Sequence, residues 1–143
     1  MVKRIIGIGF VVAVTTGLVT VSAQQTEPTP EQVAAQATET RQGLFKVLSY
    51  NLGAISGMAR GTVEFDAAVA ERNANIIASL APLIPEMFAA HDTRAFDVET
   101  EALPIIWDRM DEFQEKANNL VSGANTFAAI AKTGDRNAII GGI

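Results

Sequence analysis

Arg41 and Phe45 are the two residues whose types and spacing point most directly to chemistry. Residues four apart lie on the same face of a helix, so the pattern predicts that a guanidinium and an aromatic ring point toward one object. Burying an unpaired guanidinium is costly, so Arg41 is expected to have an anionic partner or to reach the rim of this face. A surface ion pair with Glu39, or with a carboxylate on a neighbouring helix, is the alternative. The apolar stripe is predicted to continue through Leu48, Leu52 and Ile55.

Other reactive side chains are scarce. The 143 residues contain no cysteine and one histidine, His91. They contain no Ser/His/Asp or Cys/His set, no glycine-rich phosphate loop between a strand and a helix, and no Glu-x-x-His pair for two metals. His91 stands beside Asp92 and is interpreted as a solvated loop residue, because a metal-bound histidine needs partner ligands at matched geometry. The sequence therefore predicts no metal site and no enzyme activity.

Residues 1–23 differ in kind from the rest of the chain. Lys3 and Arg4 precede an uncharged, mostly apolar run over residues 5–21, and Ala23 ends a stretch of small residues suited to signal peptidase. We interpret residues 1–23 as a signal peptide and residues 24–143 as one helical domain. An uncleaved membrane anchor is the alternative, but the run is shorter than the roughly 20 residues that a bilayer requires and contains three glycines.

Composition narrows the possible partners. Removal of residues 1–23, which hold two basic and no acidic side chains, leaves 120 residues with a net charge of −7. This balance argues against nucleic acid, and signal cleavage would leave no membrane segment. Although small exported domains often depend on disulfides, 120 residues can bury an adequate core without them. A single domain exported to the periplasm is predicted.

Helical signals account for most of residues 29–143. Thr29, Pro30 and Gln32 predict a helix start with a capping box, and this first helix should end near Gly57 or Gly61. Asp66 can cap a second helix, in which Asn73 is the polar exception and which Pro82 and Pro85 should limit. The predicted elements that follow are a long connection over 85–103, a third and longest helix over 104–132, and a fourth that begins near Arg136.

These elements predict an all-α, antiparallel four-helix bundle of up-down-up-down topology, with the fourth helix cut short. The third helix should turn an apolar side inward, with residues Ile106, Met110, Phe113, Ala117, Leu120, Ala124, Phe127 and Ala131. Three inner stripes would leave an apolar groove in the place of the fourth helix. Such a groove favours binding of a partner or self-association.

Two tracts resemble the cytochrome c prime family, the exported four-helix haem proteins of bacteria. The first is Glu39-Thr40-Arg41-Gln42 followed by Phe45 and Asn51-Leu52-Gly53, and the second is Gly123-Ala124-Asn125-Thr126 followed by Ala131-Lys132-Thr133-Gly134-Asp135. The resemblance implies haem c attached through a Cys-x-x-Cys-His motif on the fourth helix, whose histidine ligates the iron. It implies that Arg41 approaches a haem propionate and that Phe45 shields the vacant face of the iron. Electron transfer or nitric oxide binding, a homodimer and a periplasmic redox partner are further implications.

The chain departs from the family pattern at the attachment motif. It has no cysteine, and His91 lies in the predicted connection rather than in a Cys-x-x-Cys-His run. By the resemblance, Ile143 falls about two helical turns before the first expected cysteine, so the chain is interpreted as truncated and inactive by itself. The alternative interpretation is a haem-free helical module that self-associates or holds a partner helix in the open groove.

Overall fold

A computed structural model describes residues 27–142, and the predicted signal peptide and Ile143 lie outside this range. All of the regular structure in the described range is helical. Its elements are α1 (Pro30–Arg60), α2 (Ala67–Leu80), α3 (Leu83–Ala90), α4 (Ile105–Asp108), α5 (Met110–Ala131) and α6 (Arg136–Gly141). Within this part of the chain, no helix combines the length and apolar character needed to cross a bilayer.

The predicted helix starts are confirmed. Thr29 and Gln32 form a reciprocal capping box at α1, and the Asp66 side chain accepts a hydrogen bond from a backbone N–H of α2. Asp135 caps α6 in the same way. α1 ends at Gly61, whose φ of 71° is left-handed and therefore suits glycine.

Two predicted boundaries are wrong. The predicted connection over 85–103 begins too early, because α3 continues to Ala90 with Pro85 as its third residue. Proline is tolerated there since the N–H groups of a first helical turn have no partner within the helix. The predicted third helix is interrupted at Arg109, where φ is −131° and ψ is 52°, and this break separates α4 from α5. α1 is thus the longest helix, with 31 residues against 22 in α5.

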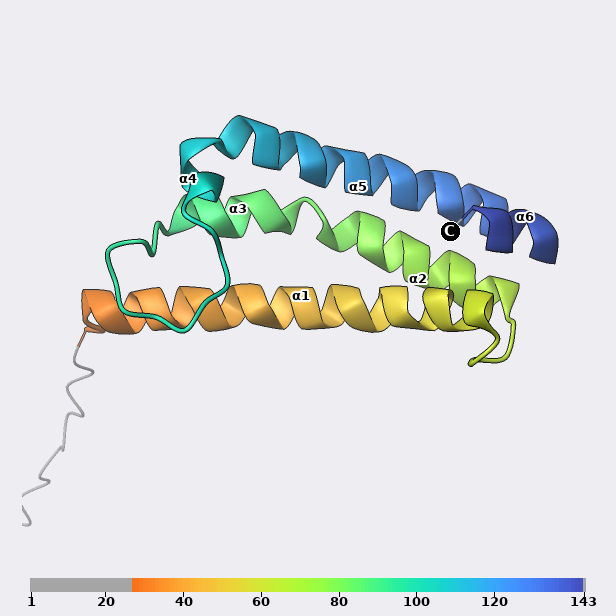
Figure 1. Cartoon of the computed structure of the whole chain (residues 1–143), viewed down its shortest axis with the longest axis horizontal. Helices are drawn as coiled ribbons and strands as arrows, with labels where there is room; N and C mark the ends of the chain where they lie inside the picture. Colours follow the sequence, from red (N-terminus) through yellow and green to blue (C-terminus); the bar gives the residue numbers. More distant parts are fainter. Residues whose placement is uncertain (1–26, 143) are drawn as a thin grey trace, which may run out of the picture.

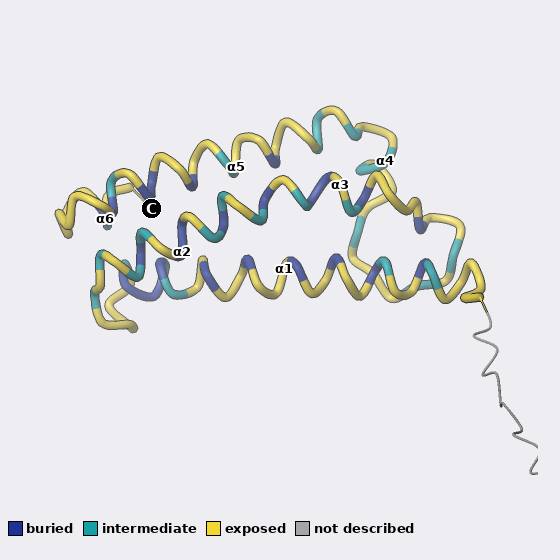
Figure 2. The backbone as a smooth tube through the Cα atoms, turned by 180° about the vertical axis from the view of Figure 1, so that it is seen from behind, coloured by how far each residue is buried: buried dark blue, intermediate teal, exposed yellow. Residues whose placement is uncertain are grey.

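The long helices run antiparallel, as predicted. Figure 1 shows α1 along most of the length of the molecule, α2 and α3 returning beside it, and α5 on the far side of α2. Connection 91–104 passes from α3 across the N-terminal half of α1 before it reaches α4. α2 packs extensively against both α1 and α5, whereas α1 and α5 have little direct contact. The buried side of α1 faces α2 and α3 (Figure 2).

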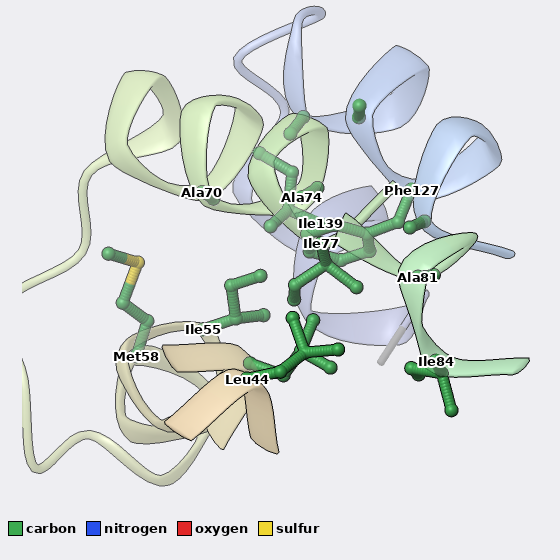
Figure 3. Close-up of a cluster of buried hydrophobic side chains, with 14 of the residues drawn as sticks. Leu44, Ile55, Met58, Ala70, Ala74, Ile77, Ala81, Ile84, Phe127 and Ile139 are labelled. Carbon is green, nitrogen blue, oxygen red and sulfur yellow. The ribbon is translucent and has the colours of Figure 1, made fainter. Parts of the chain in front are cut away.

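The core lies around α2. Small residues of α2 meet small residues of α5, which lets the two helix axes approach closely. These buried alanines are Ala70 and Ala74 on α2 and Ala124, Ala128 and Ala131 on α5. Larger side chains fill the space toward the other helices, including Leu44 and Ile55 from α1, Ile84 from α3 and Ile139 from α6 (Figure 3).

The predicted apolar stripes need correction at two positions. Leu52 is 53% exposed, and Asn51 is the buried residue at that turn of α1. Leu120 on α5 is 40% exposed. Asn51 is accommodated because its amide donates to the Val47 carbonyl at 2.8 Å, and the amide of the buried Asn73 donates to the Asn51 carbonyl at 3.5 Å. Asn73, the predicted polar exception in α2, therefore forms a buried hydrogen bond between α2 and α1.

Candidate functional site

A cavity of about 770 Å³ opens near the N-terminal half of α1. Its walls come from α1, α3, α4, α5 and connection 91–104, so no single stretch of sequence builds it. The lining residues are Thr38, Arg41, Gln42, Phe45, Lys46, Ser49, Phe88, Glu99, Thr100, Glu101, Ala102, Ile106 and Phe113. Its volume is in the range of sites that bind small molecules.

Arg41 and Phe45 both line this cavity, as their spacing on α1 predicts. Arg41 is only 4% exposed and forms part of the inner wall, whereas Phe45 is 41% exposed. The structure therefore places a buried cation and a half-exposed aromatic ring at one site. It does not bring His91 there.

Aromatic rings contact the Arg41 guanidinium in place of the predicted ion-pair partner. Its central carbon lies 4.7 Å from the Phe88 ring centroid and 5.5 Å from that of Trp107. The side chain also donates to the Ala37 carbonyl at 3.1 Å and to the Thr93 hydroxyl at 3.2 Å.

The expected anionic partner is not found among residues 27–142, where none of the ion pairs includes Arg41. The surface pair with Glu39 is likewise wrong, because the guanidinium is buried. A weakly hydrated guanidinium can use aromatic faces in place of a carboxylate. Burial lowers the pKa of Arg41, and the nearby charge of Asp92 opposes part of this shift. An arginine still keeps its proton at neutral pH, so the cavity wall carries a fixed positive charge.

Connection 91–104 is fastened to the helices at two places. Arg94 pairs with Asp92 at 2.6 Å and with Asp108 of α4 at 2.5 Å, and it also lies over the Trp107 ring. These contacts lower the pKa of Asp92, chiefly through its hydrogen bonds to Arg94. At the cavity itself, the Gln42 amide donates to the Glu99 carbonyl at 3.0 Å. The connection is therefore part of the site.

Sequence reasoning missed several residues of this site. Phe88 and Trp107 hold Arg41, yet the first lies in a segment predicted as an irregular connection and the second was given no role. Glu99, Thr100 and Glu101 belong to the predicted connection, and they line the cavity. No local pattern marks these residues, because the contacts that gather them join α1 to segments more than forty positions away.

Thr38 lies one turn before Arg41 and is 6% exposed. Its hydroxyl is a buried side-chain polar atom that has no hydrogen-bond partner in the described part of the chain. Buried polar groups are normally paired, so the Thr38 hydroxyl is an exception at the wall of this cavity.

His91 is exposed and borders a second, smaller cavity of about 350 Å³ at the start of α1. That cavity is separate from the one at Arg41 and shares no lining residue with it. Over residues 27–142, no cluster of three or more His, Asp or Glu side chains could hold a metal ion. Iron ligation by His91 therefore receives no support from its position.

The fold and the cavity define an antiparallel helical bundle with a largely apolar site between its helices and a buried arginine in the wall of that site. The family model described as cytochrome c′ matches residues 36–141. The chain belongs to the cytochrome c′ family. Proteins of this family carry haem and are not enzymes.

Relatives agree in sequence and in structure. Cytochrome c-554 of Cereibacter sphaeroides is 34% identical over 96 residues, which cover 66% of this chain and 72% of that protein. The match to a second cytochrome c-554 from this species covers 63% of the length of that protein. Cytochrome c prime from Shewanella frigidimarina matches with a TM-score of 0.65 and 33% identity over 76% of this chain and 83% of that one. A cytochrome c′ with ligand-controlled dimer dissociation matches with a TM-score of 0.63 and 28% identity, covering 82% and 86% of the two chains.

Replacing Thr38 by valine should stabilise the protein. Thr38→Val removes the unpaired hydroxyl and keeps the β-branched shape, so we expect the free energy of unfolding to rise by about 1 kcal/mol. Urea unfolding followed by circular dichroism measures this change. Thr40→Val is the matched control on the same helix, because the Thr40 hydroxyl is exposed and donates to the Gln36 carbonyl at 2.7 Å. A loss of stability in Thr38→Val that exceeds the loss in the control would contradict the assignment of an unpaired hydroxyl.

Proposed function

We propose that the protein serves a periplasmic haem c system of the cytochrome c′ type, in electron transfer or in the binding of a small gas such as nitric oxide at a five-coordinate iron. The observation that carries this proposal is the family match over residues 36–141, within which Arg41 and Phe45 line one cavity. The predicted signal peptide supports export.

The cavity fits one end of a haem. A propionate is a carboxylate, and the buried guanidinium of Arg41 and the free hydroxyl of Thr38 are the groups that such a carboxylate requires. Phe88 and Phe113 offer flat apolar surface to a porphyrin. Phe45 would stand over the open face of the iron and exclude water and large ligands. When bound, haem would supply the redox centre and the gas-binding atom.

The same residues do not supply attachment or ligation. The 143 residues contain no cysteine, so none of them can form a thioether bond, and the single histidine borders the other cavity. We therefore expect these residues by themselves to carry little or no haem c activity. The proposal assigns Arg41 to the propionate and Phe45 to the distal face, and it assigns no iron ligand to this chain.

We expect that haem is not covalently attached to this chain. When the protein is expressed in a bacterium that attaches haem c in its periplasm, the purified chain should show no haem stain after a denaturing gel. Free thiols are required for a thioether link, and the chain has none. A co-expressed cytochrome that carries Cys-x-x-Cys-His is the positive control. A stained band at the mass of this chain, together with a Soret band, would overturn the expectation.

Non-covalent haem tests the role of Arg41. When hemin is titrated into the purified protein and followed by absorbance, Arg41→Gln should weaken binding about tenfold, because a charge-assisted hydrogen bond to a propionate is lost. Arg72→Gln is the control, since Arg72 is exposed on α2 and does not line the cavity. Equal affinities in the two variants, or no binding by the wild-type protein, would remove the propionate assignment.

A haem-free interaction module remains the second candidate function. The specific observation that favours it is the exposure of Leu52 at 53% and Leu120 at 40% on two helices that do not pack directly against each other. A related proposal is a homodimer that pairs α1 and α2 of two copies. Val47 and Tyr50 support it, because α1 exposes them at 47% and 79%. One similar solved protein is described as a dimer that dissociates under ligand control.

Sedimentation equilibrium at several concentrations separates these assemblies. We expect a discrete dimer that Tyr50→Lys dissociates, because a charge at a buried interface is costly. Val63→Lys is the control, since Val63 is exposed in the turn after α1. If Leu52→Lys disrupts association and Tyr50→Lys does not, the open side of the bundle is the interface, as the interaction module requires. Indefinite aggregation would exclude the dimer.

A further inference from the structure

The polar groups of the Arg41 cavity define the charge of a ligand. Two hydrogen bonds to described residues leave most of the five N–H donors of Arg41 without an acceptor among residues 27–142. One turn away, the Thr38 hydroxyl is buried and unpaired at the same wall. A carboxylate accepts hydrogen bonds from both kinds of donor, and its charge would complement the guanidinium.

The remaining inner wall is apolar. Phe88, Ile106 and Phe113 line the cavity from α3, α4 and α5, and the Phe88 ring lies against the guanidinium. Ala102 and Phe45 also line it. Such a wall gains free energy from covering hydrocarbon rather than from binding a compact polar anion. A ligand that fits therefore has an apolar body attached to its carboxylate.

Acidic residues at the cavity limit how much negative charge a ligand can carry. Glu99 and Glu101 line the cavity from connection 91–104, and both are exposed. Lys46 on α1 is the one exposed basic residue that lines it. A second anionic group on the ligand would meet these carboxylates, and like charges repel. The arrangement therefore disfavours a ligand whose second anionic group lies close to Glu99 and Glu101.

We propose that the cavity binds monocarboxylates with an apolar chain, such as a fatty acid, through Arg41 and Thr38. This site goes beyond the haem proposal, since it requires neither cysteine nor an iron ligand and uses only residues that the structure places together. The hydrocarbon chain lies against Phe88, Ile106 and Phe113. The carboxylate fills the position that no acceptor of the described chain occupies.

Trp107 provides a direct assay. It is the single tryptophan of the chain, and its ring centroid lies 5.5 Å from the guanidinium carbon of Arg41. Octanoate titrated into the purified, haem-free protein should change Trp107 fluorescence along a saturable curve. Octanol has the same chain without a charge, so it tests whether binding needs the negative charge of the carboxylate. Octylamine carries a positive charge in its place, and octanedioate carries a second carboxylate. We expect octanol to bind about tenfold more weakly than octanoate, and octylamine and octanedioate to bind more weakly still.

Two variants test the contacts. Arg41→Gln should weaken octanoate binding about tenfold and leave octanol binding unchanged, whereas Arg72→Gln should behave as the wild-type protein does. Circular dichroism verifies that each variant is folded. Thr38→Val should also weaken octanoate binding relative to Thr40→Val. It tests the site independently should Arg41→Gln fail to fold, because it removes no charge from the core.

Equal affinity for octanoate and octanol would overturn the carboxylate site and leave only apolar binding. Unchanged octanoate binding in both Arg41→Gln and Thr38→Val would also overturn it, as would the absence of any fluorescence response confirmed by calorimetry. The measurements contain no haem, so they can succeed where haem attachment fails. Conversely, haem staining can succeed where octanoate binding fails, and the two proposals are thus tested separately.

Discussion

The buried guanidinium of Arg41 is the constraint on which the functional end of this bundle depends. A charge with 4% exposure must be compensated, and within residues 27–142 two aromatic faces, a backbone carbonyl and a threonine hydroxyl do so. These groups come from α1, α3, α4 and connection 91–104. The compensation therefore joins four segments, and it leaves three of the five N–H donors of Arg41 without an acceptor among residues 27–142.

Trp107 connects this buried cation to the surface. Its ring contacts Arg41 on the inside and Arg94 on the outside, and its indole N–H donates to the Phe88 carbonyl at 2.9 Å. Arg94 is in turn held by Asp92 and Asp108. Exposed ion pairs contribute little stability alone, but here they fasten the connection that lines the cavity. The short helix α4, which the break at Arg109 separates from α5, places Trp107 at this junction.

The exposed apolar residues of α1 and α5 follow from how the helices pack. Alanines on α2 and α5 allow close approach, so α2 becomes the central helix and α1 and α5 remain apart on its two sides. Leu52 and Leu120 are consequently left partly exposed. A partner helix or a second copy, as proposed above, would cover this apolar surface, which the described helices do not cover for one another.

Local sequence was sufficient for the helical class, the antiparallel order, the caps at Thr29 and Asp66, and the shared face of Arg41 and Phe45. These features depend on helical periodicity and on hydrogen bonds within a few residues, which a sequence states directly. Only the tertiary structure decided that aromatic rings rather than a carboxylate hold Arg41, that Asn51 rather than Leu52 is buried, and that connection 91–104 lines the cavity. Those outcomes depend on which segments meet in space. A residue such as Trp107 contacts partners from distant parts of the chain, and no local pattern encodes them.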